Sequence, residues 1–123
     1  MKRVTILLFV FLAAGFVRGD VNLSREQDPV VVNAKTIALR LENPRVRVFD
    51  ATLKPGEKEN LHSHPAYVVY VIEGGKIRNH LPDGKVTEAE YKPGDVFFRD
   101  PLTHWAENIG STTLRLVVVE LKN

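Results

Sequence analysis

The residues with the clearest chemical potential are the histidines of the triplet His62-Ser63-His64 and, forty residues after it, His104. Residues two apart in a β-strand point to the same face, so the imidazoles of His62 and His64 enter one volume. Two neutral imidazoles are poor partners in a protein interior because each ring needs its own hydrogen bonds, whereas a shared cation satisfies both. Three imidazoles are a usual ligand set of an open metal site. The three histidines therefore predict a site for one divalent metal ion, and ordinary surface or core histidines are the alternative.

The segments that must position these side chains are short strands separated by turns. Gly, Pro, Asp and Asn mark a turn about every 8–12 residues, and no segment keeps a helical period for more than two turns. This spacing predicts an all-β fold, an antiparallel sandwich or small barrel. The expected strands lie at 30–32, 45–53, 61–64, 67–72, 76–81, 86–91, 96–98 and 113–121, with His104 starting another.

Two groups of residues around the histidines resemble the two-part signature of the cupin superfamily. In the first, five residues separate Gly56 from His62, and Gly74 closes the strand that follows His64. The second group consists of Pro93-Gly94-Asp95, Pro101, His104 and Asn108. The resemblance covers about 46–120. It implies an antiparallel double-sheet jelly-roll barrel whose inward residues line a ligand cavity, with His62, His64 and His104 as the metal ligands.

One position departs from the cupin pattern. Cupins usually supply a fourth ligand, a glutamate a few residues after the second histidine, but 65–69 read Pro-Ala-Tyr-Val-Val. Counting back from Gly74 puts Tyr67 in the place of that glutamate. A neutral three-histidine set leaves more of the ion open, as metal catalysis requires; a weakened site is the alternative. Tyr67 is the candidate catalytic residue, because its phenol could donate to a ligand of the metal, although it could also simply pack.

Other polar residues carry weaker predictions. Arg78 is expected near the cavity mouth as a partner for an anion, and Asn108 is expected to bond the backbone near the site. Solvated positions are predicted for His80 beside a hairpin turn and for Glu57, Glu59 and Asp95 in turns.

The first nineteen residues predict an export signal. Lys2 and Arg3 precede an apolar run over 4–17, and Val17 and Gly19 fit a cleavage site, so 1–19 read as a secretory signal peptide. A membrane anchor is the alternative, but the run is shorter than the roughly 20 residues that a spanning helix needs. The prediction is a periplasmic or secreted protein without a stable membrane anchor after cleavage. The mature chain would then consist of two parts, an N-terminal arm with an edge strand at 20–44 and the barrel at 45–123.

The net charge and the cysteine content limit the classes of partner and metal site that the chain could have. Three of the 17 basic residues lie in the predicted signal peptide, which leaves 14 against 15 acidic residues. Neither this balance nor any basic cluster favours nucleic acid. The chain has no cysteine, which excludes disulfides and thiolate-bound zinc. Three imidazoles accept iron, nickel, manganese, zinc or copper, so the sequence does not identify the metal.

These observations support two functions. The first is a metal-dependent enzyme of oxygenase or isomerase type that acts on a small molecule; the alternative is a non-catalytic module that binds a small molecule or metal. Within the cupins, the chain is similar to short stand-alone proteins labelled as β-alanine degradation proteins, a likeness carried by 46–48, 67–69, 73–75 and 107–110. Small cupins commonly pair through sheet edges. A homodimer is therefore expected, with 30–32 and the final strand as the edge.

Overall fold

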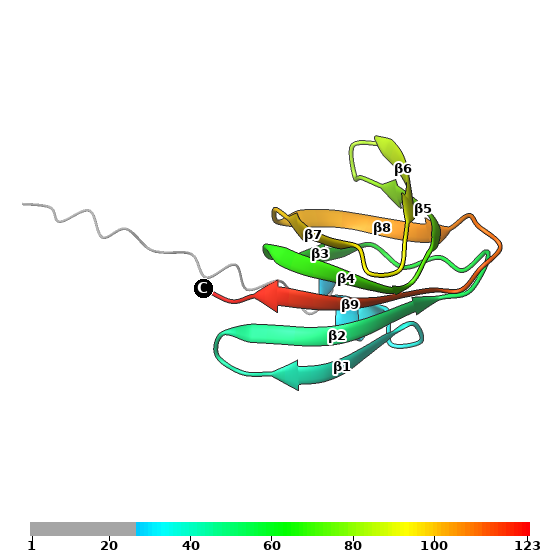
Figure 1. Cartoon of the computed structure of the whole chain (residues 1–123). Helices are drawn as coiled ribbons and strands as arrows, with labels where there is room; N and C mark the ends of the chain where they lie inside the picture. Colours follow the sequence, from blue (N-terminus) through cyan, green and yellow to red (C-terminus); the bar gives the residue numbers. More distant parts are fainter. Residues whose placement is uncertain (1–26) are drawn as a thin grey trace, which may run out of the picture.

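A computed structural model describes residues 27–123, which fold into two facing β-sheets (Figure 1). The five-stranded sheet has the order β1-β2-β9-β4-β7, the four-stranded sheet has the order β3-β8-β5-β6, and neighbouring strands run antiparallel. This confirms the predicted all-β double-sheet jelly-roll. The elements are α1 (Pro29–Val32), β1 (Ile37–Glu42), β2 (Val46–Leu53), β3 (His62–His64), β4 (Tyr67–Glu73), β5 (Gly75–His80), β6 (Val86–Tyr91), β7 (Val96–Arg99), β8 (Leu102–Asn108) and β9 (Leu114–Leu121).

The core lies between the sheets and follows the two-residue period of the strands. On β4, Tyr67, Val69 and Val71 are buried while the residues between them are more exposed. The same alternation places Phe49 and Ala51 of β2 in contact with this cluster. Because alternate side chains point to opposite faces, one apolar face per strand is enough to build the interior.

The segment 30–32 was expected to be a strand, and this prediction is wrong. It forms the single turn α1, because the Asp28 carboxylate accepts a hydrogen bond from the Val30 amide at 2.9 Å and Pro29 occupies the first helical turn. The edge strand of this region is β1, whose residues the turn-based analysis did not recognise.

The expected dimer edge is also wrong in its details. Figure 1 shows β9 between β2 and β4, so both of its hydrogen-bonding sides are already paired. The final strand therefore cannot extend a sheet into a second copy, and 30–32 are not a strand. The five-stranded sheet ends instead at β1 and β7.

The predicted signal peptide at 1–19 lies outside the described residues. Within 27–123, no helix is both long and apolar enough to cross a membrane.

Candidate metal centre

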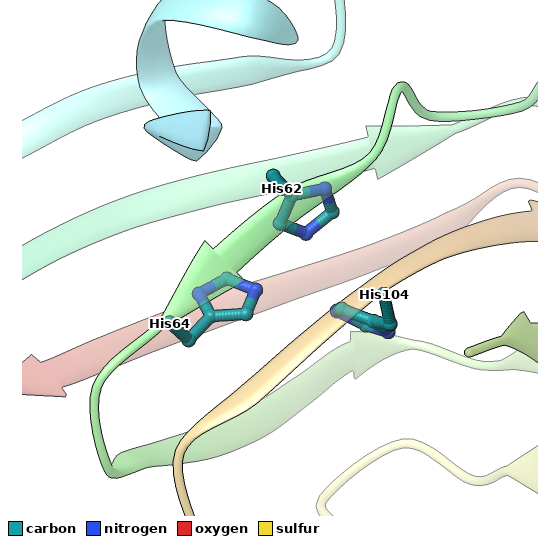
Figure 2. Close-up of side chains that lie close together, drawn as sticks. All are labelled: His62, His64 and His104. Atoms are coloured by element: carbon teal, nitrogen blue, oxygen red, sulfur yellow. The ribbon is translucent and has the colours of Figure 1, made fainter. Parts of the chain in front are cut away.

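The three predicted ligands meet inside the barrel. β3 pairs with β8 so that His62 lies directly opposite His104, and His64 lies two residues further on the same face of β3. The side chains point toward one another from the two strands (Figure 2). Their ring centroids are 4.7 Å apart for His62 and His64, 4.7 Å for His62 and His104, and 5.4 Å for His64 and His104. One nitrogen of each ring lies within 4.8 Å of those of the other two, which is close enough for one ion to bridge them.

The ring of His62 is held through its Nδ1 atom. This atom lies 2.7 Å from the carbonyl oxygen of Asn60 and 3.1 Å from Nδ2 of Asn33. A carbonyl can only accept, and the shorter contact therefore places the hydrogen on Nδ1. The Asn33 amide has the same carbonyl as an acceptor at 3.3 Å. The Nε2 atom of His62 is then the one with a lone pair for a metal.

The other two rings are oriented in the same way. Nδ1 of His64 donates to the carboxylate of Glu120 at 3.2 Å, and Nδ1 of His104 donates to the amide oxygen of Asn79 at 3.1 Å. A hydrogen bond from the far nitrogen fixes the tautomer and the orientation of a metal-binding imidazole. All three rings are therefore set to offer Nε2 to the space between them.

Burial keeps two of the rings uncharged. Burial, together with the neighbouring histidines, lowers the pKa of His62 to about 4 and the pKa of His104 to about 2. Both rings are neutral at pH 7, and only the neutral ring binds a metal ion.

The residues present fit a divalent ion. Nε2 of His104 is buried and has no hydrogen-bond partner among the described residues. Leaving such an atom unpaired costs about 1–3 kcal/mol, and a cation bound there would remove that cost. Three imidazole nitrogens are the donor set that iron, nickel, copper and zinc accept readily.

The triad lies in the wall of a cavity of about 340 Å³. Its other walls are mainly apolar and include Phe49, Val69, Leu114 and Val118. Such a volume suits a small molecule. Ser63 points away from this cavity and its hydroxyl lies 2.7 Å from that of Thr103, so it takes no part in the site.

Tyr67 enters the cavity, as its strand position predicted. Its ring centroid lies 4.4 Å from that of His64, and the side chain is buried. Burial raises the pKa of its phenol well above the usual value, so the hydroxyl keeps its proton at neutral pH. Tyr67 can therefore donate a hydrogen bond into the cavity and cannot act as a base there.

The basic residue at the cavity is Arg99, and the prediction for Arg78 is wrong. Arg78 lies on the outer side of β5, where its guanidinium pairs with Glu88 at 2.7 Å and with Glu107 at 3.1 Å. Arg99 lines the cavity from β7 and is exposed, which places it where the cavity opens.

Glu59 was expected to be a solvated turn residue, and this is also wrong. Its side chain is only 8% exposed, lines the cavity, and has Oε2 3.7 Å from Nε2 of His62. Burial raises the pKa of this carboxyl to about 7. The polar stretch 57–60 gave no sign of burial, because the cause is the packing of the stretch against β8.

Glu120 is a second site residue that the sequence analysis missed. It is 3% exposed and belongs to the inward side of β9, together with Leu114, Leu116 and Val118. A signal was present, since a charged residue at an inward position of an alternating strand needs a buried partner.

The remaining predicted residues lie away from the triad. Asn108 donates to the carbonyl oxygens of Leu53 and Thr112, so its predicted bonding to backbone is confirmed, but it does not line the cavity. His80 is only partly solvated, because its side chain is 20% exposed, stacks on Trp105 at 3.6 Å and lies 2.9 Å from Glu107.

Comparison with known proteins decides the family. A family model described as a cupin domain matches residues 49–120, more than half of the chain. The chain belongs to the cupins. The predicted resemblance is thus confirmed at the level of the superfamily, and the family match includes all three histidines.

Several solved structures share the fold of this cupin. A cupin domain from Bordetella pertussis is 25% identical, with a TM-score of 0.65 over 71% of this chain and 92% of that one. A predicted oxalate decarboxylase from Thermotoga maritima is 26% identical, with a TM-score of 0.53 over 71% and 79%. A protein with a double-stranded β-helix domain from Klebsiella pneumoniae is 27% identical, with a TM-score of 0.54 over 70% and 76%. No curated protein sequence matches the chain, so the similarity to β-alanine degradation proteins stays a prediction.

Proposed function

We propose that this cupin binds one divalent metal ion through His62, His64 and His104 and uses it to transform a small molecule held in the cavity. The observation that carries the proposal is the set of three Nε2 atoms turned toward one space, with that of His104 buried and unpartnered. Three oriented nitrogen donors on the wall of a cavity leave one side of a bound ion facing the space for a small molecule.

The chain's own groups suggest how a small molecule would sit. The apolar walls would exclude water and hold its body, while the phenol of Tyr67, which stays protonated, would donate a hydrogen bond to it. Arg99 at the opening would pair with an anionic group, beside the exposed carboxylate of Asp100 in the same lining. A bound ion would supply Lewis-acid chemistry, or redox chemistry if it is iron, manganese or copper. These features favour a small molecule with an apolar body and a negative group.

Metal analysis combined with turnover tests the enzyme hypothesis. The purified protein should contain one divalent ion per chain, and its activity on small carboxylic acids, followed by product formation and by oxygen consumption, should be lost with a chelator and return with the metal. A protein that contains no metal as isolated, and takes up none of the five candidate metals, would contradict the proposal.

The alternative is a non-catalytic binding module, and the same preparation separates the two functions. Tight binding of a small molecule that a chelator does not affect, without any product, would favour the module. The apolar lining of the cavity supports this alternative, because such a lining can bind a small molecule without a metal.

We also propose that the protein is a homodimer, formed through the outer face of the five-stranded sheet instead of an edge. Strand pairing aligns one apolar row across all five strands, and exposed Tyr70 and Val96 lie in the next row. Monomeric proteins rarely expose an apolar patch of more than a few hundred Å². The apolar row that crosses all five strands consists of Leu41, Val48, Val119, Val68 and Phe98.

A second copy is the partner that the charges on this face favour. Asp50, whose side chain lies on this face, is 2.7 Å from Arg40 and 3.6 Å from Arg115. These charges are already paired, so two such faces related by a twofold axis would not repel each other.

We also propose that the protein is exported, because residues 1–19 read as a secretory signal peptide. Cell fractionation tests this proposal, and the protein should be found in the periplasmic or secreted fraction.

A further inference from the structure

Glu59 is a buried carboxylate beside the triad without a cationic partner in the cavity. Its Oε2 lies 3.7 Å from Nε2 of His62, the nitrogen that the hydrogen bonds leave for a metal. Two other charged residues line the cavity, Arg99 and Asp100, and both are exposed. A buried carboxylate is costly unless a positive charge or hydrogen bonds compensate it.

The backbone around Glu59 is fixed toward the site by β8. The Glu59 amide donates to the carbonyl oxygen of Ala106 at 2.8 Å, and Lys58 forms a bridge with Glu107. Ala106 lies two residues after His104 on the same inward face of β8. The backbone of Glu59 therefore lies beside Ala106, next to the triad, and its carboxylate extends toward His62.

The distance between Glu59 and His62 fits two ligands of one ion. Donors bound to the same ion at about 2.1 Å lie roughly 3.0–3.4 Å apart in neighbouring positions and about 4.2 Å apart in opposite positions. The observed 3.7 Å lies between these two separations.

We propose that Glu59 is the carboxylate ligand of this metal centre, in place of the glutamate that Tyr67 replaces. The inference rests on the proposed three-histidine site. The set would then contain three neutral nitrogens and one anionic oxygen, so that a dication is partly neutralised. Carboxylate oxygen suits Mn²⁺, whereas imidazole suits Ni²⁺ and Cu²⁺. Loss of Glu59 should therefore weaken the binding of Mn²⁺ more than the binding of Ni²⁺.

The test is metal titration of the purified, metal-free protein with Mn²⁺ and Ni²⁺ by competition with a chelator of known affinity. Glu59→Gln keeps the size of the side chain and removes its charge. The dissociation constant for Mn²⁺ should rise by at least about tenfold. Glu57→Gln is the matched control, since Glu57 lies in the same stretch but its carboxylate accepts from the Lys54 amide; its Mn²⁺ affinity should stay within about twofold of wild type.

Two further results separate the possible failures. If Glu59→Gln binds both ions like the wild type while His62→Ala loses them, the inference about Glu59 is overturned and the three-histidine site stands. If His62→Ala also binds both ions unchanged, the proposed function fails with it. The thermal midpoint of metal-free Glu59→Gln should be no lower than that of the wild type, so weaker Mn²⁺ binding would not reflect unfolding.

Discussion

The carboxylate of Glu120 on β9 accepts a hydrogen bond from Nδ1 of His64 on β3 at 3.2 Å, and both side chains are 4% exposed. The two residues are 56 positions apart in the chain and belong to different sheets. This bond joins the sheets at the candidate metal centre and turns Nε2 of His64 toward the other two histidines. The opposite sheet thus determines how one ligand is presented.

Glu120→Gln should weaken metal binding about 10–100-fold, because the neutral amide orients His64 less firmly and no longer increases its basicity. Chelator competition measures this change. Glu73→Gln, on the exposed end of β4, is the control and should bind metal like the wild type. Equal affinity of the Glu120 and Glu73 variants would show that the bond to His64 does not support the site.

Removal of one ligand should abolish stable metal binding. A full ligand set contributes about 10–16 kcal/mol to the free energy of metal binding in structural zinc sites. Because His104→Ala removes one of these ligands, it should raise the dissociation constant on the order of 100-fold. Metal content after dialysis should fall from one ion per chain to near zero. The fourth histidine is the control: His80→Ala loses a stacking contact with Trp105 outside the cavity and should keep its metal. Equal loss in both variants would point to general destabilisation.

The stability of the metal-free protein should fall as the pH decreases below 6.5. The pKa values of His62 and His104 are lowered to about 4 and about 2, so the unfolded chain binds two protons near pH 5.5 that the folded protein does not. Glu59 opposes this effect, because its pKa of about 7 lets the folded protein hold a proton that the unfolded chain releases above pH 4.5. The net difference is one proton, or about 1.4 kcal/mol per pH unit.

Glu59→Gln should double this slope, since the opposing proton is removed and the two histidine protons remain. Urea unfolding between pH 5 and 6, in the presence of a chelator, measures both slopes. Identical slopes for the wild type and the variant would mean that Glu59 has the same pKa in the folded and unfolded states.

A charge on the outer face of the five-stranded sheet should separate the proposed dimer. Phe98 is 57% exposed in the apolar row, and Phe98→Glu would bury an unpaired carboxylate in the interface at a cost of about 2–5 kcal/mol. Light scattering should find a dimer for the wild type and a monomer for the variant, with unchanged metal content. Val86→Glu, at a 47% exposed valine on β6 in the other sheet, should remain a dimer. A monomeric wild type would remove the proposal.

The sequence by itself predicted an all-β fold, and the resemblance of its motifs to the cupins implied the barrel and the three candidate metal ligands. The period-two pattern decides which side chains share a face, so His62 and His64 had to point into one volume. The turn spacing and the position of His104 after a bend then placed the third imidazole on another strand of the same barrel. Tyr67 followed from its match to the position of the cupin glutamate, together with the parity of its strand.

Only the tertiary structure decided which groups surround those ligands. Glu120, Asn79 and Glu59 reach the histidines from segments whose relative position depends on how the sheets face each other, and no local pattern encodes that. The choice between Arg78 and Arg99 at the cavity depended on the outer carboxylates that bind Arg78. The local period of a strand determines which face each of its side chains occupies. The partner that it meets there is set by packing between segments far apart in the chain.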